Sequence, residues 1–382
     1  MLSVNRRRCG KTNTWFQQTN ALRAKLYIKL ASYVRLYMRS TVELFKGFFR
    51  QEIGVDLGTA NTLIYVSNQG VVLREPSVVA IDEQNNVIAV GEAARAMLGR
   101  TPQGVKATRP LRDGVIADFK HAEVMLKTFI DRVKAGGTFM SPHMAIGIPS
   151  GITSVEKNAI REAAVRAKAA QIYLPEEPMA AAIGAALPVT EPTGCMIVDI
   201  GGGTTEVAVI SLSGIVVNES IRIAGDEMND AIVQYLKKVH SLAIGEQTAE
   251  EIKFRLGSAY KTIDNDKYDV RGLNVINGLP RTVAVSRGEI REALAEPLSQ
   301  IVEAVRRTLE RTPPELAADI FNRGIILAGG GALLQGLDEL IANETEVPVF
   351  IAEDPLSCVA IGTGKMLSDP IYRRVLEQCA QN

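Results

Sequence analysis

Two short segments of this 382-residue chain repeat one arrangement of aspartate, glycine and threonine between apolar residues. The first reads Ile53-Gly-Val-Asp-Leu-Gly-Thr-Ala-Asn-Thr-Leu-Ile-Tyr-Val66, and the second reads Met196-Ile-Val-Asp-Ile-Gly-Gly-Gly-Thr-Thr-Glu-Val-Ala-Val-Ile210. Each predicts a strand, a tight turn and a second strand. A glycine turn lets backbone N–H groups approach an anion, and threonine hydroxyls add donors. Because each aspartate can hold a hydrated cation, the two hairpins predict a grip on a polyphosphate from opposite sides.

A third glycine segment supports this interpretation. Leu327-Ala-Gly-Gly-Gly331 reads as a buried strand that enters a helix through glycines. By itself such a turn is a packing feature. The three glycines from Gly201 weaken a sheet unless something approaches the backbone. Together, the three segments predict a nucleotide pocket.

Composition excludes several classes of function. The formal net charge is zero, which gives no reason to expect a nucleic-acid partner. The four cysteines form no CxxC pair and the three histidines are dispersed, so neither a zinc site nor a disulfide framework is expected, and a reducing cytosol fits best. No apolar run approaches the roughly 20 residues that span a bilayer.

The N-terminus differs from the rest of the chain. Residues 1–40 hold nine Lys or Arg and no acid, and the first carboxylate is Glu43. No secretory signal pattern is present. The leader is either an organellar transit peptide or an upstream extension, and we favour an extension with Met38 as the physiological start, because the organised pattern begins just after it.

The remaining elements form two similar α/β halves. The pattern predicts helices over 118–133, 153–169, 178–187, 227–239, 248–259 and 287–311, and further strands over 145–149, 171–174 and 324–328, with a β-rich patch over 268–286. Thr153 and Glu156 form a capping box. Strands followed by helices, twice over, indicate two similar domains facing each other.

Longer stretches give the chain a family resemblance. From about Met38 onwards it resembles the MreB family of bacterial actins, within the actin-like ATPase superfamily. The matching stretches, besides the two hairpins, are Glu75-Pro-Ser-Val-Val-Ala-Ile81, Arg112-Asp-Gly-Val-Ile-Ala-Asp118, Glu176-Glu-Pro-Met-Ala-Ala-Ala-Ile-Gly184, Thr312-Pro-Pro-Glu-Leu316 and Glu353-Asp-Pro-Leu356.

The resemblance implies an α/β, actin-like (ribonuclease H-like) ATPase fold, with two similar domains, each of two subdomains, around a nucleotide cleft. It implies subdomain IA over 51–80, 118–190 and 357–382, IB over 81–117, IIA over 191–230 and 293–356, and IIB over 231–292. A basic extension over 1–40 and an amphipathic membrane helix over 41–50 precede them.

The resemblance also implies contacts to ATP. The first phosphate loop would be Thr59, Ala60 and Asn61, and the second would be Gly202, Gly203 and Thr204. Ribose and adenine would lie on Glu250, Glu251, Ile252 and Lys253, and the base would be covered by Gly330, Gly331, Ala332 and Leu333. Residues 250 and 253 share one face of a predicted helix. Without the resemblance, a solvated charged surface is the plainer interpretation of that face.

Hydrolysis needs an aligned water and stabilisation of spreading charge. The resemblance assigns these roles to Glu177 and Thr204, and places Asp56 and Asp199 on Mg²⁺ through its water shell. Alone, Glu177 before a proline would be helix N-terminal charge. Pro175 and Ala328 depart from the isoleucine and threonine common in relatives. They leave these contacts intact and bear on the fine geometry and the rate.

A separate signal concerns membranes. Over residues 41–50, a helical projection places Glu43, Lys46 and Arg50 on one arc and the apolar residues, including Phe45, Phe48 and Phe49, on the opposite half. This arrangement suits an interfacial helix on anionic lipid. The alternative is a helix docked on its own domain. The loop around Phe139 and Met140 is a weaker candidate for a second lipid contact.

The resemblance implies an ATP-dependent cytoskeletal protein with slow hydrolysis coupled to filament state. We expect it to form paired protofilaments on the inner face of the cytoplasmic membrane, with cell-elongation membrane proteins and wall synthases as partners, and to scaffold wall synthesis for rod shape. Two rivals remain. A sugar or acetate kinase would need a substrate pocket with a base, for which Glu177 is the only candidate. A chaperone ATPase would need a substrate domain, whereas little follows Lys365.

Overall fold

The computed structural model describes residues 51–134, 141–261 and 266–381. The predicted basic extension, the amphipathic helix with its phenylalanines at 45, 48 and 49, and the loop at 139–140 lie outside the described residues. Within the described part, no helix combines the length and the apolar character needed to cross a membrane.

The first hairpin begins a five-stranded sheet whose order is β10-β9-β1-β2-β3. Strands β1, β2 and β3 pair antiparallel, whereas β9 and β10 add to β1 in parallel. Apolar residues of β1 alternate, so Ile53 and Val55 pack with helices α3 and α4 on one face, while Gly54 faces α11 on the other. The bounds are β1 Glu52–Leu57, β2 Asn61–Val66, β3 Gly70–Pro76, β9 His143–Ile146, β10 Gln171–Tyr173, α3 Phe119–Lys134, α4 Ser154–Arg166 and α11 Cys358–Ser368.

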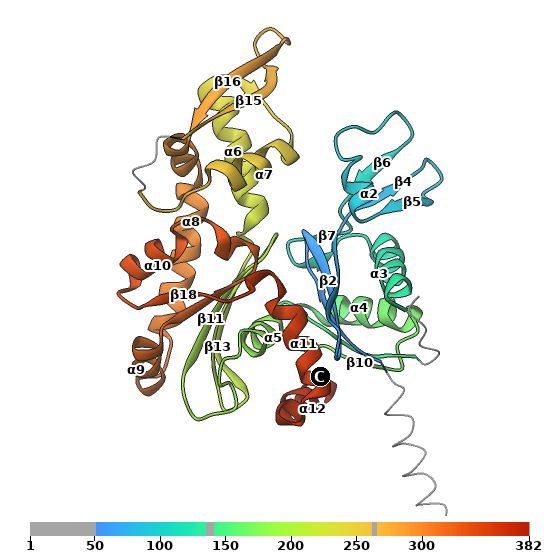
Figure 1. Ribbon diagram of the computed structural model, residues 1–382, viewed down its shortest axis with the longest axis vertical. Coiled ribbons are helices and arrows are strands. Elements are labelled where there is room, and N and C mark those ends of the chain that lie inside the picture. The colour runs from blue at the N-terminus through green and yellow to red at the C-terminus, as the bar shows by residue number, and fades with distance from the viewer. Residues whose placement is uncertain (1–50, 135–140, 262–265, 382) are drawn as a thin grey trace, which may run out of the picture. The chain divides into compact units, whose positions relative to one another are not determined.

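The second hairpin begins a sheet of the same design, with order β13-β12-β11-β17-β18. Here too two antiparallel pairings are followed by two parallel ones. The repetition confirms the predicted pair of similar α/β halves (Figure 1). The bounds are β11 Cys195–Ile200, β12 Thr205–Ser211, β13 Gly214–Ile221, β17 Ile325–Ala328 and β18 Val349–Ile351.

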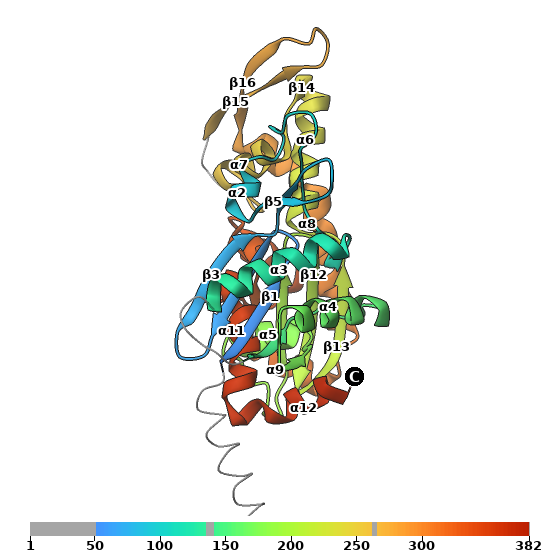
Figure 2. The same cartoon turned by 90° about the vertical axis from the view of Figure 1, so that its right-hand side faces the viewer.

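A smaller sheet accompanies each half (Figures 1 and 2). In the first half its order is β5-β4-β6, beside the short helix α2. In the second half its order is β14-β15-β16, beside α6 and α7. The subdomain boundaries given above stay a prediction. The bounds are β4 Val79–Ile81, β5 Val87–Val90, β6 Lys106–Thr108, β14 Leu242–Ala243, β15 Lys267–Asn274, β16 Pro280–Ser286, α2 Glu92–Arg95, α6 Gly225–His240 and α7 Glu246–Leu256; a separate ribbon pairs β7 Leu111–Arg112 with β8 Val115–Ile116.

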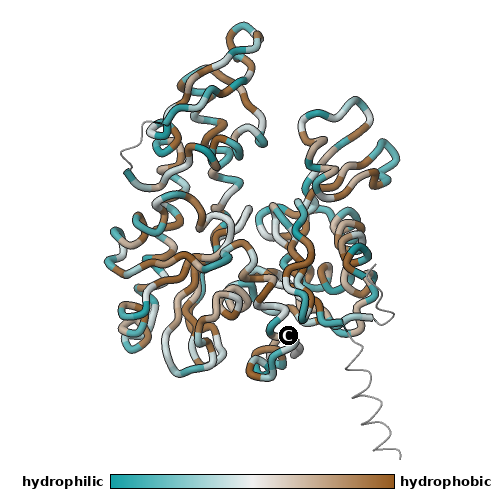
Figure 3. The backbone as a smooth tube through the Cα atoms, in the orientation of Figure 1, coloured by the Kyte–Doolittle hydropathy of each residue, from teal (hydrophilic) through white to brown (hydrophobic). Residues whose placement is uncertain are grey.

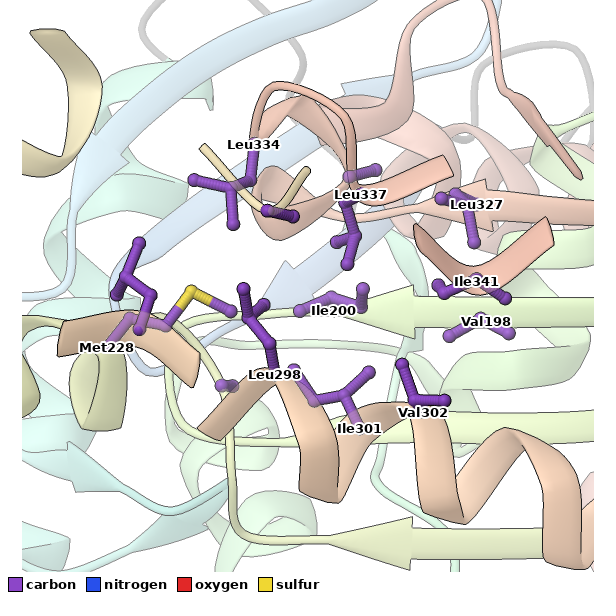
Figure 4. Packing of buried hydrophobic residues seen from close by; sticks show 14 of the residues in the cluster. Val198, Ile200, Met228, Leu298, Ile301, Val302, Leu327, Leu334, Leu337 and Ile341 are labelled. Atoms are coloured by element: carbon purple, nitrogen blue, oxygen red, sulfur yellow. The ribbon is translucent and has the colours of Figure 1, made fainter. Parts of the chain in front are cut away.

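The core of the second half fixes the orientation of its hairpin. Val198 and Ile200 of β11 lie between α8 (Arg287–Glu310) and the segment that carries Leu337 and Ile341 (Figure 4). Because side chains alternate along a strand, Asp199 between them points to the opposite face. Figure 3 shows hydrophobic residues concentrated along the central strands.

Helix ends differ from prediction at several places. The capping box of Thr153 and Glu156 is present, but α4 ends at Arg166 rather than at residue 169, because Lys168 adopts a left-handed conformation with φ 64°. Helix α5 (Glu177–Gly184) likewise ends before residue 187, with Ala186 at φ 60°. The remaining helical segments are α9 Pro314–Arg323, η1 Gly330–Leu333, α10 Leu337–Thr345, η2 Pro355–Ser357, η3 Pro370–Tyr372 and α12 Arg373–Gln381.

Helices α5 and α11 cross between the two large sheets (Figure 1). The crossing is close because glycines lie at both points of contact. A Cβ at Gly184 would clash with the backbone of Cys358, and a Cβ at Gly362 would clash with the backbone of Ala180. Backbone therefore packs directly on backbone where the halves meet.

Candidate functional site

A cavity of about 540 Å³ lies where the two halves face each other. Its lining comes from the turns of both hairpins, from α7 and from the glycine segment after β17. The lining includes Asp56, Thr59, Ala60, Asn61, Glu177, Asp199, Gly202, Gly203, Thr204, Glu250, Lys253, Gly330, Gly331 and Leu333. The structure therefore brings together most of the predicted site residues from distant parts of the sequence.

The turn of the first hairpin is held by a buried serine. The Ser77 hydroxyl donates to the Gly58 carbonyl at 2.7 Å, and the Ser77 N–H donates to the Ala60 carbonyl at 2.9 Å. The same hydroxyl lies 2.9 Å from that of Thr62, and both side chains are fully buried. The turn is thus fixed before any ligand arrives.

The turn of the second hairpin touches the first. The Gly201 N–H donates to the Thr204 carbonyl at 2.8 Å and closes the turn. A Cβ at Gly202 would lie 2.7 Å from the Cβ of Ala60. Only glycine allows the two turns to approach this closely, so the backbone N–H groups of both are presented to one small volume.

Four carboxyl groups, those of Asp56, Glu177, Asp199 and Glu206, lie close enough together near these turns to repel one another. Burial raises the pKa values of Asp56 and Asp199 to about 7, and Asp56 adds repulsion to Asp199. Burial also raises the pKa of Glu206 to about 7. No group of three or more metal-ligating side chains among the described residues is close enough to hold a metal ion directly.

Glu177 lies at the start of α5 and lines the same cavity. Its backbone N–H donates to the Ile148 carbonyl at 2.7 Å, which fixes the start of the helix. Burial, reinforced by Asp56, Glu206 and Asp199, raises the pKa of Glu177 well above its usual value. A buried carboxyl of this kind can accept or orient a proton-bearing group.

The α7 side of the cavity carries a partly buried cation. The Lys253 ammonium donates to the Gly225 carbonyl at 2.7 Å, and burial lowers the pKa of Lys253. Glu250, one turn earlier, pairs with Arg95 of the other half at 2.9 Å. Phe254 is 72% exposed and also lines the cavity, offering a flat apolar face.

Three predicted site residues do not line the cavity. Ile252 and Ala332 are fully buried in the core, and Glu251 is exposed and pairs with Arg255. Sequence reasoning also missed several lining residues. Phe254 had a usable signal, because it lies at i+4 from Glu250 on the same helical face. The other missed residues include Gly114, Gly225, Met228, Gly257, Arg287, Leu334, Gln335, Pro355 and Leu356.

The paired sheets and their facing turns define an actin-like protein. A structure of the MamK double helical filament shares the fold, with a TM-score of 0.72 at 20% identity, and covers 84% of this chain and 99% of MamK. A crystal structure of MreB5 of Spiroplasma citri bound to ADP has a TM-score of 0.81 at 39% identity, and covers 85% of this chain and 98% of MreB5. The MreB5 structure bound to AMPPNP gives a TM-score of 0.80.

The family follows from the sequence comparisons. The MreB/Mbl protein family model matches residues 50–373. The cell shape-determining protein Mbl of Bacillus subtilis (strain 168) is 52% identical over 322 residues, which is 84% of this chain and 97% of Mbl. The cell shape-determining protein MreB of Escherichia coli (strain K12) is 54% identical over 330 residues, which is 85% of this chain and 95% of MreB. The chain belongs to the MreB/Mbl family, which confirms the predicted resemblance and fold class.

Proposed function

We propose that the chain binds ATP with Mg²⁺ in the cavity and uses it to assemble into cytoskeletal filaments that determine cell shape. The observation that carries the proposal is the meeting of two equivalent glycine turns over one buried acidic cluster. The ADP and AMPPNP complexes of MreB5, and the cell-shape names of Mbl and MreB, support it.

The chain's residues suit a nucleotide in a defined orientation. The backbone N–H groups at Thr59–Asn61 and Gly202–Thr204 would hold the phosphates. The Lys253 and Glu250 face would take the ribose, and Phe254 with Leu333 would contact the base. Asp56 and Asp199 would hold Mg²⁺ through water, and the bound ion would neutralise phosphate charge.

The same arrangement would also support slow hydrolysis of the nucleotide. Glu177 would orient the attacking water and accept hydrogen bonding from it, and Thr204 would fix the water's second contact. No other catalytic base is needed for positioning to accelerate phosphoryl transfer. The filament, rather than a small-molecule product, would be the output of the cycle.

The cellular setting is part of the proposal. We infer filaments of paired protofilaments, held on the inner face of the cytoplasmic membrane through the phenylalanines of residues 41–50. There the filaments would scaffold cell-wall synthesis together with cell-elongation membrane proteins and wall synthases.

Sedimentation with nucleotide and lipid tests the proposal. The full chain, with Mg²⁺ and ATP, ADP or no nucleotide, is centrifuged with and without vesicles of anionic lipid. We expect a pellet that requires nucleotide and filaments that float with the vesicles. A chain that stays in the supernatant and phosphorylates a sugar or acetate would instead be a kinase, and this outcome would overturn the proposal.

A further inference from the structure

Arg109 crosses from the first half of the molecule to the second. It lies between β6 and β7 and forms ion pairs with two carboxylates at once. Its Nη1 is 2.8 Å from Asp226 Oδ1, and its Nη2 is 2.8 Å from Glu246 Oε1. The Arg109 side chain is only 16% exposed. Two well-formed contacts on one planar guanidinium define both distance and angle.

Both acidic partners lie in the first turns of helices that build the cavity. Asp226 is in the first turn of α6 and Glu246 is in the first turn of α7. The Asp226 N–H donates to the Gly202 carbonyl at 2.7 Å, which links Arg109 to the second phosphate turn through one residue. Helix α7 carries Glu250 and Lys253, and the Lys253 ammonium donates a hydrogen bond to the carbonyl of Gly225, the residue before Asp226.

The environment favours a charged, paired arginine. Burial by itself would lower the pKa of Arg109, but Asp226 and Glu246 raise it above its usual value. Charge-assisted hydrogen bonds at partly buried positions are stronger than those on the surface. A second pair, Arg95 with Glu250, joins the same parts at 2.9 Å, but the Arg95 side chain is 38% exposed. Arg109 is therefore the better-shielded of the two arginines, and its partners Asp226 and Glu246 are 27% and 49% exposed.

We propose that Arg109 is a positioning residue that sets how long a nucleotide stays bound, by tying the first turns of α6 and α7 to the opposite side of the cavity. The inference rests on the proposed nucleotide site. Release requires the two sides to separate, and with Arg109 in place its two ion pairs must break first. Loss of Arg109 therefore accelerates release and leaves the groups that orient the attacking water unchanged.

The release rate of tritiated ADP tests this role. The full chain is loaded with Mg²⁺ and labelled ADP at a concentration where nothing sediments, and excess unlabelled ADP is added. We expect Arg109→Ala to release ADP about tenfold faster, as expected for the loss of charge-assisted hydrogen bonds. Arg109→Lys keeps the charge without the planar fork and should give an intermediate rate. Arg100→Ala, an exposed arginine with no ion pair among the described residues, should match the wild type.

A double-mutant cycle separates positioning from general destabilisation. In a Glu246→Ala background, Arg109→Ala should accelerate release less than it does in the wild type, because the pair is already broken. If Arg109→Ala does not fold, Glu246→Ala by itself should also accelerate release. Wild-type release rates in folded Arg109→Ala, or fully additive effects in the cycle, overturn the inference and leave the proposed function intact. Failure of the wild-type chain to bind ADP overturns both.

Discussion

Asp199→Asn should make the nucleotide-free protein more stable while removing its response to nucleotide. Asp199 is 7% exposed, and its pKa is raised to about 7 from an ordinary value of 3.8. A carboxyl whose pKa is raised in the folded state lowers stability at every pH at which the unfolded chain would ionise it. The penalty is therefore full above pH 7 and declines as the pH falls towards 3.8. At 1.36 kcal/mol per pKa unit, the raised pKa costs at most about 4 kcal/mol at pH 8, where Asp199 is ionised, and about 2 kcal/mol at pH 5, where the folded protein keeps Asp199 protonated although the unfolded chain would ionise it.

Urea unfolding at pH 8 and pH 5 measures this effect. Asn has nearly the same shape as Asp and carries no charge, so the variant should gain most stability at pH 8 and about half as much at pH 5. Asp230→Asn, a change at an exposed position on α6, should stay within about 0.5 kcal/mol of the wild type at both pH values.

Nucleotide provides the second half of the test. With Mg²⁺-ATP at about 100 times its Kd, the wild type should gain about 2.7 kcal/mol. The Asp199→Asn variant should gain little, because it has lost one of the two carboxylates predicted to face the ion. A variant that is less stable than the wild type at pH 8, or that retains the full nucleotide response, would refute the reasoning.

Three further predictions concern chemistry, the phosphate turn and the membrane. Glu177→Ala should still bind ATP but hydrolyse it roughly 10–1000-fold more slowly, and its filaments should last longer. An unchanged rate of phosphate release would mean that Glu177 only supplies negative charge at the start of its helix. Ser77→Ala should lose about 1–3 kcal/mol in urea unfolding, because the Gly58 carbonyl loses the hydrogen bond donated by the buried Ser77 hydroxyl, and should weaken ATP binding in calorimetry. Replacing Phe45, Phe48 and Phe49 by serine should release filaments from anionic vesicles without preventing ATP-driven assembly. The reason is that burying each phenylalanine in lipid contributes on the order of 2 kcal/mol. A chain starting at Met38 should bind vesicles as well as the full chain, and binding that instead needs residues 1–37 would move the anchor to the basic leader.

The central hairpins could be predicted because their information is local. Apolar alternation on either side of a glycine turn specifies two paired strands, and both strand pairs form as expected. Helix α4 starts where its capping box predicted. Helix ends were less predictable, because Lys168 and Ala186 adopt left-handed conformations that their residue types do not favour.

Contacts between distant segments were beyond sequence reasoning. Ser77, which follows strand β3, donates to the carbonyl of Gly58, which precedes strand β2, and Arg109 of the first half pairs with Asp226 of the second. Ser77 belongs to one of the stretches that carry the family resemblance, but nothing in the sequence pairs it with Gly58, and Arg109 belongs to none of those stretches. Each residue becomes significant only through the partner that the fold supplies. Ile252 shows the converse, because Glu250 and Lys253 of the same helix line the cavity while the Ile252 side chain enters the core.

The glycine crossing of α5 and α11 has a mechanical consequence. Backbones in direct contact at Gly184 and Gly362 leave no layer of side chains on which one helix can slide past the other. Relative movement of the two halves would then occur by rotation about this contact rather than by sliding. The crossing acts as the pivot, and the two small sheets, β5-β4-β6 and β14-β15-β16, lie far from it (Figure 1). A small rotation about this contact becomes a large displacement of the small sheets, because they lie far from it. Adding a single methyl group to Gly184 or Gly362 would therefore change the position of those sheets.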